Sequence, residues 1–169
     1  MDSKADSERQ TTARASSPSR PLDPVELAVW LGFLSTHLKL LRTLDQELVD
    51  TEHISMSSFE VLLTVAESPG GRIRMKDIAA SLLISRSGLT RIVDELERRG
   101  FVKREKCETD ARGSDAVLTP EGRKAYRRAN KVHLVNLRRE FLGKLTDEQL
   151  KTLSEIWETL GFARLSSEC

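Results

Sequence analysis

The chain has 169 residues, with 38% hydrophobic residues, 31% charged residues and a formal net charge of +1. This length suits one domain, or one domain with an oligomerisation arm, and the composition favours a helical protein with solvated faces. The charge excludes a globally basic protein, and no apolar run approaches the ~20 residues that a bilayer crossing needs.

Residues 1–21 are rich in Ser, Thr, Arg and Pro and predict a disordered tail, because they can bury little apolar surface. Order is expected from Asp23, which with Glu26 forms a capping box around Pro24. Apolar side chains then recur at spacings of three and four as far as Leu48. The apolar face is broader than one helix contact requires, so residues 22–55 predict a helix that packs against a partner helix.

The second predicted helix opens at a capping box in Ser57–Glu60 and ends at the turn residues 68–71. Residues 72–75 are short enough for a single extended rung. The helical pattern resumes from Lys76 through Leu82. We therefore expect two helices separated by a brief extended segment.

A turn at Leu83 and Ile84 leads to a helix for which Ser85 is the predicted N-cap and Gly100 the left-handed C-terminal residue. Residues 101–106 and 116–118 predict two antiparallel strands. Thr119-Pro120 starts a long helix that runs to about residue 143. Its segment 123–139 carries several Arg and Lys residues and no acid, so a neutral total can hide a basic face. Residues 146–149 cap the last helix.

Two short helices joined by a tight turn and followed by a hairpin are the layout of a winged helix-turn-helix. The predicted fold is mainly α, with long dimerisation helices and a two-stranded wing hairpin. The helix after Ser85 is the candidate reader of DNA, since short and hydrogen-bonding side chains fill its first turns. Gly88 costs roughly 1 kcal/mol there relative to Ala. A close approach of DNA or of the preceding helix would explain it. A solvated helix in a small bundle is the alternative.

Residues 75–122, MKDIAASLLISRSGLTRIVDELERRGFVKREKCETDARGSDAVLTPEG, resemble the MarR family of transcriptional regulators. In that family an acid and an arginine precede an L-T-x-x-G motif, as in Asp110, Arg112 and 118–122 here. The resemblance covers residues 24 to 165. It implies a homodimer that binds a pseudo-palindromic duplex, with the reading helices in successive major grooves and the wing tips in the flanking minor grooves.

After the predicted tail 1–21, the resemblance implies a dimerisation helix 22–55, a winged helix-turn-helix domain 56–119 and C-terminal dimerisation helices 120–165. It assigns Arg112 to the minor groove and makes Asp110 the acid that orients it. On the wing strands, Lys103, Arg104 and Lys106 are weaker candidates, because strand charges are often only solvated. The residues carried onto the reading helix are Ser85, Arg86, Ser87, Thr90 and Arg91.

Members of the family often bind small aromatic, phenolic or carboxylate ligands between the dimerisation helices and the DNA-binding lobe, and then release DNA. Trp30 and His37 are seven residues apart, so they share one helix face and offer an aromatic wall with a titratable group. The alternative is that Trp30 is dimer core and His37 a satisfied polar group at its edge. The complete candidate set is Trp30, His37, Met56, Phe59 and His133.

The resulting hypothesis is a cytoplasmic, sequence-specific repressor of double-stranded DNA, released from its operator by such a ligand. It has no cofactor, no metal and no membrane partner. An enzyme is disfavoured because the chain lacks a G-x-S-x-G motif, a Walker-type loop and His/Cys metal spacing. The alternatives are a winged-helix protein-interaction module and a redox-responsive regulator acting through Cys107, beside Lys106. Cys107 and Cys169 are too few for a disulfide framework, and the N-terminus lacks the apolar core of a signal peptide.

Overall fold

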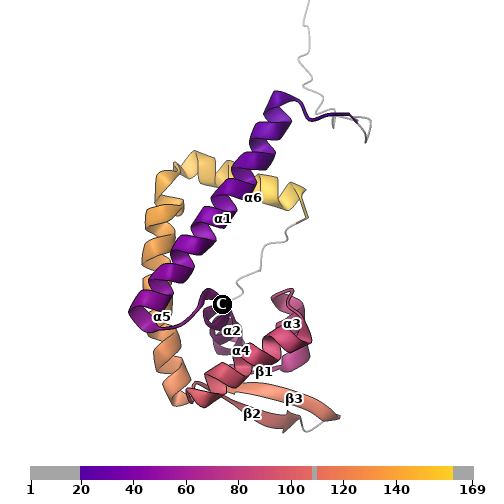
Figure 1. Cartoon of the computed structure of the whole chain (residues 1–169), viewed down its shortest axis with the longest axis vertical. Coiled ribbons are helices and arrows are strands. Elements are labelled where there is room, and N and C mark those ends of the chain that lie inside the picture. The colour runs from indigo at the N-terminus through magenta and orange to yellow at the C-terminus, as the bar shows by residue number, and fades with distance from the viewer. Residues whose placement is uncertain (1–19, 108–109, 162–169) are drawn as a thin grey trace, which may run out of the picture. The chain divides into compact units, whose positions relative to one another are not determined.

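A computed structural model describes residues 20–107 and 110–161, with the backbone alone at 107 and 110–112 (Figure 1). Its contacts divide the chain into two units, with the boundary after Thr36. We refer to residues 1–36 as the N-terminal unit and to residues 37–169 as the main unit. Most of the predicted tail, 1–21, and the terminal Cys169 lie outside the described residues.

The N-terminal unit contains the first turns of helix α1 (Pro24–Glu52), which begins at the predicted capping box. The Glu26 amide donates to Asp23 Oδ1 at 2.9 Å, and the Asp23 amide donates to Glu26 Oε2 at 2.8 Å. Further along, the rings of Trp30 and Phe33 stack at 6.3 Å, and half of the Trp30 surface is exposed. The broad apolar face predicted for this helix is therefore present and largely uncovered within one chain.

Helix α2 (Met56–Glu67) starts earlier than predicted. The cap is Ser55, whose Oγ accepts from the Ser58 amide at 3.2 Å, and the capping box predicted at Ser57–Glu60 is wrong. The Met56 amide donates to Asp45 Oδ1 of α1 at 2.7 Å, so a contact eleven residues away fixes the start of the helix. After α2, the short helix η1 (Pro69–Gly71) turns the chain into strand β1 (Arg72–Arg74).

The helix-turn-helix comprises α3 (Met75–Ser81) and α4 (Arg86–Arg98). Leu83 in the turn takes a left-handed backbone conformation with φ 52°, and Ser85 caps α4 as predicted. The chain leaves α4 through Gly100, whose φ of 70° confirms the predicted left-handed position. Leu89, Val93 and Leu96 are buried, so one face of α4 packs on the core while the other faces solvent.

The sheet has three strands in the order β1-β3-β2, formed by β1, β2 (Val102–Cys107) and β3 (Asp110–Leu118). All pairs are antiparallel, with Val102 opposite Leu118 and Ile73 opposite Ala116. The hairpin of β2 and β3 is the predicted wing. The extended rung predicted at 72–75 joins it as a third strand.

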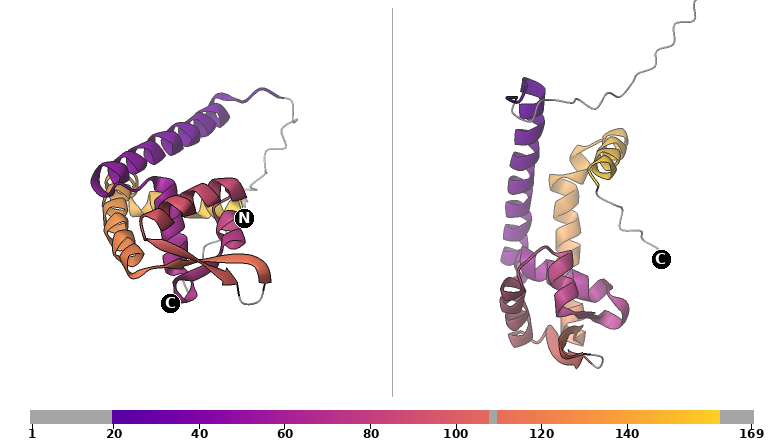
Figure 2. Two further views of the ribbon diagram at one scale, coloured as in Figure 1. Left: turned by 60° about the horizontal axis from the view of Figure 1, so that its bottom comes forward. Right: turned by 90° about the vertical axis from the view of Figure 1, so that its right-hand side faces the viewer.

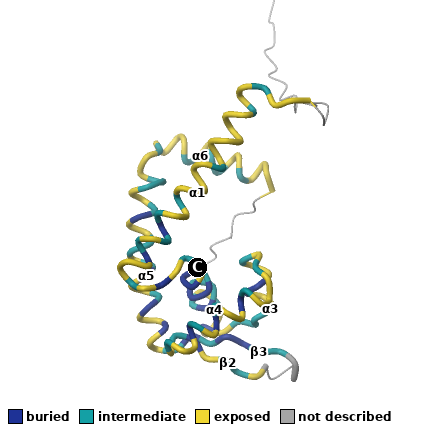
Figure 3. The backbone as a smooth tube through the Cα atoms, viewed as in Figure 1, coloured by how far each residue is buried: buried dark blue, intermediate teal, exposed yellow. Residues whose placement is uncertain are grey.

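Helix α5 (Pro120–Glu140), the short helix η2 (Leu142–Lys144) and helix α6 (Asp147–Thr159) complete the main unit. The predicted cap at Thr146 is a full capping box with Gln149. In Figure 1 and in the right view of Figure 2 the wing hairpin and α6 lie at opposite ends of this unit. Its core joins α2, α4, β3 and α5 (Figure 3), around Phe59, Leu62, Leu89, Leu96 and Ala125.

The junction between α4, the wing and α5 depends on the carbonyl of Phe101. The Thr119 amide donates to this oxygen at 3.0 Å, and the Thr119 hydroxyl lies within 2.6 Å of the Gly100 carbonyl. The same hydroxyl oxygen accepts from the Gly122 amide at 2.9 Å and caps α5. A Cβ on Gly122 would lie 1.9 Å from the Phe101 oxygen. The L-T-x-x-G motif therefore serves the close approach of two backbones.

We predict that Gly122→Ala lowers the free energy of unfolding by about 2 kcal/mol, because backbone atoms must shift to admit the methyl group. Urea unfolding followed by circular dichroism measures this loss. Gly32→Ala is the control, since a Cβ there meets nothing within 4 Å and Ala favours a helix. Equal stability of Gly122→Ala and the wild type would contradict the assignment.

Candidate nucleic-acid interface

The polar residues predicted to read DNA lie on the solvent face of α4. Those exposed to solvent are Ser85, Arg86, Ser87, Thr90 and Arg91. This exposure follows from the burial of Leu89, Val93 and Leu96 on the opposite face. The structure therefore presents the predicted set together on one exposed surface.

Two hydroxyls of this set also form hydrogen bonds to the backbone of α4. Ser85 Oγ accepts from the Gly88 amide at 3.1 Å, and Thr90 Oγ1 donates to the Arg86 carbonyl at 2.8 Å. A Cβ on Gly88 would lie 3.1 Å from Ser85 Oγ. Among the described atoms, the close contact at Gly88 is therefore with the capping hydroxyl of Ser85. It is not with α3, which was one of the two predicted explanations.

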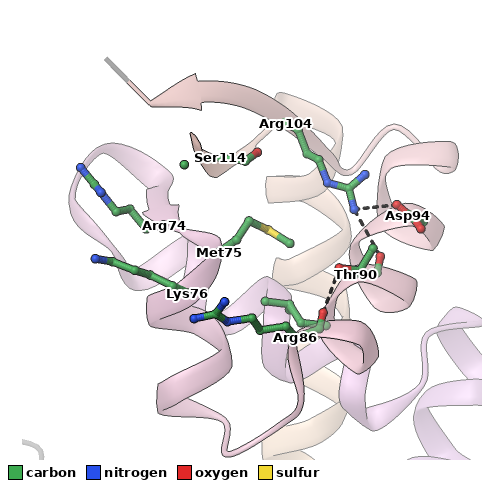
Figure 4. A pocket seen from close by; sticks show the side chains of 10 residues that line it. Arg74, Met75, Lys76, Arg86, Thr90, Asp94, Arg104 and Ser114 are labelled. Carbon is green, nitrogen blue, oxygen red and sulfur yellow. Dashed lines mark hydrogen bonds and ion pairs between the residues drawn. The ribbon is translucent and has the colours of Figure 1, made fainter. Parts of the chain in front are cut away.

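A pocket of about 490 Å³ opens between the start of α3, the exposed face of α4 and the wing (Figure 4). Arg74, Met75 and Lys76 form one wall, and Arg104 and Ser114 of the wing lie on another side. The full lining is Arg74, Met75, Lys76, Arg86, Leu89, Thr90, Asp94, Arg104, Gly113 and Ser114. The pocket therefore joins the predicted reading helix to the wing through a surface that carries several positive charges.

Arg104 differs from the solvated strand charge that the sequence suggested. Its guanidinium lies 2.6 Å from an Asp94 carboxylate oxygen and 2.7 Å from one of Glu97. It also donates to the Thr90 carbonyl at 3.2 Å, while the Arg104 amide donates to Glu97 at 3.0 Å. These contacts fasten the wing strand β2 to α4, so Arg104 positions the wing. Lys103 pairs with Glu105 at 2.5 Å, and Lys106 is exposed.

The wing tip carries the remaining predicted DNA contact. Arg112, Asp110 and the candidate redox residue Cys107 lie outside the residues whose side chains the structure describes. Their backbones belong to β2 and β3, where Cys107 pairs with Asp110 after a shift in register. At the base of the wing, Arg72 contacts Glu105 and, at 3.2 Å, the buried carboxylate of Asp115. The tip thus extends from a braced sheet.

Comparison with known proteins places this architecture in a family. A model described as the MarR family matches residues 54–113. AbsC of Streptomyces coelicolor, a MarR-family regulator, superposes with a TM-score of 0.80 at 31% identity, over 85% of this chain and 96% of that one. Sco3205, of the same organism and family and solved in complex with DNA, has a TM-score of 0.79 at 35% identity, over 83% and 92%. The chain belongs to the MarR family of transcriptional regulators.

Curated relatives agree with this assignment. The transcriptional repressor MprA of Escherichia coli is 27% identical over 68% of this chain, and the match spans only about half of MprA, 56%. The regulator PecS of Dickeya dadantii is 30% identical over 77% of this chain and 78% of its own length. The family comprises transcriptional regulators and not enzymes, in agreement with the expectation from the sequence.

The predicted effector residues of this MarR-family chain are only partly brought together. His133 of α5 lies against the ring of Phe59 at 4.7 Å, and Tyr126 stacks on the same ring at 6.3 Å. Phe59 is only 1% exposed and Met56 packs against the core, so both contribute to packing. Trp30 belongs to the N-terminal unit and His37 is exposed in the main unit. The ligand site itself stays a prediction.

Burial changes the ionisation of this aromatic cluster. It lowers the pKa of His133 below the ordinary value of 6.5, and Nδ1 of that ring is buried without a hydrogen-bond partner among the described residues. Burial also raises the pKa of Tyr126, to which the charge of Glu67 adds, and raises the pKa of the Glu60 carboxyl. The cluster therefore favours a neutral imidazole.

Sequence reasoning did not single out two cationic residues of the pocket, Arg74 and Lys76. They flank Met75, and their only signal was their place at the start of the predicted first helix of the pair. Among the residues described, no group of three or more His, Cys, Asp or Glu side chains could hold a metal. None of the described helices combines the length and apolar character that crossing a membrane requires.

We predict that the protein loses stability as the pH falls below about 6.5, because the unfolded chain then binds a proton that folded His133 resists. The loss continues down to the folded pKa of His133. His133→Phe, which keeps a ring against Phe59, flattens this part of the profile. Urea unfolding at a series of pH values measures it. Equally steep profiles for variant and wild type would exclude His133 as the cause.

Proposed function

We propose that this MarR-family protein is a sequence-specific repressor that binds double-stranded DNA. The observation that carries the proposal is the exposed polar face of α4, held beside a wing hairpin by a buried apolar face. Such a helix fits the major groove, whose width admits an α-helix and whose base edges carry a distinct pattern of donors and acceptors. The DNA complex of Sco3205, a relative 35% identical, supports the same use of the fold.

Within α4 the side chains divide by chemistry. Arg91 can donate two hydrogen bonds to one guanine edge, and Thr90 offers a methyl group to thymine, whereas Arg86 in the first turn suits a phosphate. Ser85 and Ser87 suit phosphate or base oxygens. The capping hydroxyl of Ser85 keeps donor capacity beyond the bond it accepts, and of the two hydroxyls, 3.2 Å apart, only one can donate to the other. At the wing, Arg112 enters the minor groove while Asp110 orients it without touching DNA.

A second copy of the chain completes the DNA-binding unit. The N-terminal unit exposes a concentration of large apolar side chains, and two more are exposed in the last turn of α6 and directly after it, a pattern typical of interaction surfaces. They are Val25, Leu27, Val29, Trp30, Leu31 and Phe33, with Ile156 and Leu160. A homodimer that covers them places two reading helices one helical turn apart on a pseudo-palindrome.

Regulation by a small aromatic or phenolic acid extends this proposal. The neutral imidazole of His133 can donate or accept a hydrogen bond, and it lies beside the aromatic ring of Phe59 between α2 and α5. A ligand that separates these helices alters the spacing of the two reading helices and releases the operator. A regulator of transcription works in the compartment that holds the chromosome, so we assign the protein to the cytoplasm.

Selection from a randomised duplex pool, followed by footprinting, tests the DNA-binding proposal. We expect protection of a pseudo-palindrome and a stoichiometry of two chains per duplex. Arg91→Ala weakens binding to the selected duplex about 10- to 100-fold and relaxes the preference at one base pair, because it removes a base contact. Gel shift or fluorescence anisotropy at fixed salt measures both effects.

Arg98→Ala is the matched control, because Arg98 lies in the last turn of the same helix and pairs with Glu95. It leaves DNA affinity within about twofold of the wild type, as expected for an exposed ion pair. If no duplex were selected, or if Arg91→Ala bound the selected duplex as the wild type does, the assignment of α4 would be wrong. A protein-interaction module would then explain the exposed face.

For the effector, we expect an aromatic or phenolic acid to release the selected duplex from the wild type at a concentration that leaves His133→Phe bound. Competition anisotropy with a panel of such acids provides the measurement. Release of both proteins at the same concentrations would remove His133 from the site. Release on oxidation alone, abolished by Cys107→Ser, would favour the redox alternative instead.

A further inference from the structure

We propose that the pocket between α3, α4 and the wing holds a segment of the DNA sugar–phosphate backbone, with Lys76 and Arg86 as its phosphate ligands. This inference rests on the proposed function and specifies which strand segment the protein holds, and by which side chains. It assigns a role in DNA binding to Lys76, which lies outside the reading helix and the wing.

The pocket lies between α4 and the wing. Its lining comes from α4 on one side and from Arg104, Gly113 and Ser114 of the wing on another. When α4 occupies a major groove and the wing occupies the adjacent minor groove, one backbone separates the two grooves. That backbone has to cross the space between the two elements, and this pocket is the hollow in that space.

The positive charges of the pocket favour a bound phosphate. Lys76 and Arg86 are exposed and take part in no ion pair among the described residues, and Arg74 adds a third positive charge (Figure 4). Figure 4 shows these three side chains extending toward the same side of the pocket. A row of cations of this kind suits successive phosphates, whose counterions are released on binding.

The opposite side of the pocket is electrostatically different. Arg104 is held by the carboxylates of Asp94 and Glu97, so its charge is already balanced. Two carboxylates against one guanidinium leave this side with a net negative charge, which repels a phosphate. The anion is therefore directed toward the wall formed by α3 and the first turn of α4, where Lys76 and Arg86 lie.

The remaining lining suits the sugar and the uncharged phosphate oxygens. Met75 and Leu89 supply apolar surface that a deoxyribose can cover, and Ser114 supplies a hydroxyl donor. Half or more of the hydrogen bonds in protein–DNA complexes go to phosphate and sugar, and they fix register without reading sequence. The pocket therefore sets where α4 sits in the groove.

Salt dependence of binding to the selected duplex tests the role of Lys76. Lys76→Gln makes the slope of log affinity against log salt less steep by about 0.9 per subunit bound, because one phosphate contact is lost. In the double variant Arg74→Gln and Lys76→Gln, the slope is less steep than in Lys76→Gln by up to about 0.9 per subunit bound. Base preference in a competition assay stays as in the wild type, which the loss of a base contact would not allow.

Lys144→Gln removes the same charge in η2, just beyond α5, where Lys144 pairs with Glu140. It leaves the salt slope unchanged if only local phosphate contacts matter. A thermal melt of each variant verifies folding, and an exposed lysine without an ion pair is expected to be replaceable. An equal change of slope in Lys76→Gln and Lys144→Gln would reduce the effect to overall charge and overturn the proposal.

Neutralising single phosphates locates the contact. Duplexes carrying one methylphosphonate at successive positions between the major-groove half-site and the flanking minor groove are titrated with wild type and Lys76→Gln. We expect one or two neighbouring positions to weaken the wild type several-fold and to leave Lys76→Gln unaffected. Losses of equal size in both proteins at every position would contradict the assignment.

The same cationic side chains could bind a free phosphate ion. Calorimetric titration of the DNA-free protein with inorganic phosphate, at constant ionic strength, distinguishes a free phosphate from a phosphate of DNA. The proposal expects no saturable binding at millimolar phosphate. Saturable binding that Lys76→Gln abolishes, together with a flat methylphosphonate scan, would make the pocket a free-anion site. Failure of the wild type to select any duplex would instead overturn the proposed function, so the two failures are distinguishable.

Discussion

The fold of the DNA-binding lobe depends on one carbonyl oxygen, that of Phe101. It receives the Thr119 amide just before α5 and lies where a side chain on Gly122 would have to be. This contact joins the end of α4, the start of β2 and the start of α5 at a single point. Because the wing leaves and returns through that point, its base is fixed to both helices. The direction of the hairpin relative to α4 follows.

Beyond this junction, the orientation of α4 is determined by the packing of its apolar residues and not by its polar residues. Val93 and Leu96 are fully buried, and Phe101 continues the chain against the core. Arg99 lies over the Phe101 ring at 4.6 Å and donates to the His53 carbonyl at 2.6 Å, which ties α4 to the end of α1. The hydrogen bond from Arg99 to the His53 carbonyl therefore connects the end of α1 directly to the end of α4.

Local signals in the sequence were sufficient for the helix caps and for the winged layout. Ser85, Thr119 and Thr146 cap the helices that follow them, because a cap needs only the next three residues. The start of α2 could not be found this way, because the Met56 amide is taken by Asp45 from α1. A local capping pattern was present at Ser57–Glu60, but the distant carboxylate determined the helix start.

The candidate site shows the same division. The exposed face of α4 was predictable, because the periodicity of its apolar residues defines the opposite face. The ion pairs of Arg104 with Asp94 and Glu97 could not be predicted from the sequence. They join strand β2 to helix α4, and only the fold determines which residues of the two elements face each other. Equally, the effector candidates share chemistry but not a place: Phe59 is core, whereas Trp30 lies in the other unit.

Local pairing of charge explains how a chain of net charge +1 can present a surface suited to an anion. On the wing side of the pocket the acids of α4 balance Arg104, and their effect there is structural. On the α3 side Lys76 and Arg86 have no such partner among the described residues. Attraction for a phosphate therefore depends on which cations the fold leaves without acids, and not on how many the chain contains. A substitution that removed the ion pairs of Arg104 would shift the attraction for phosphate toward the wing. It would also weaken the attachment of the hairpin to α4.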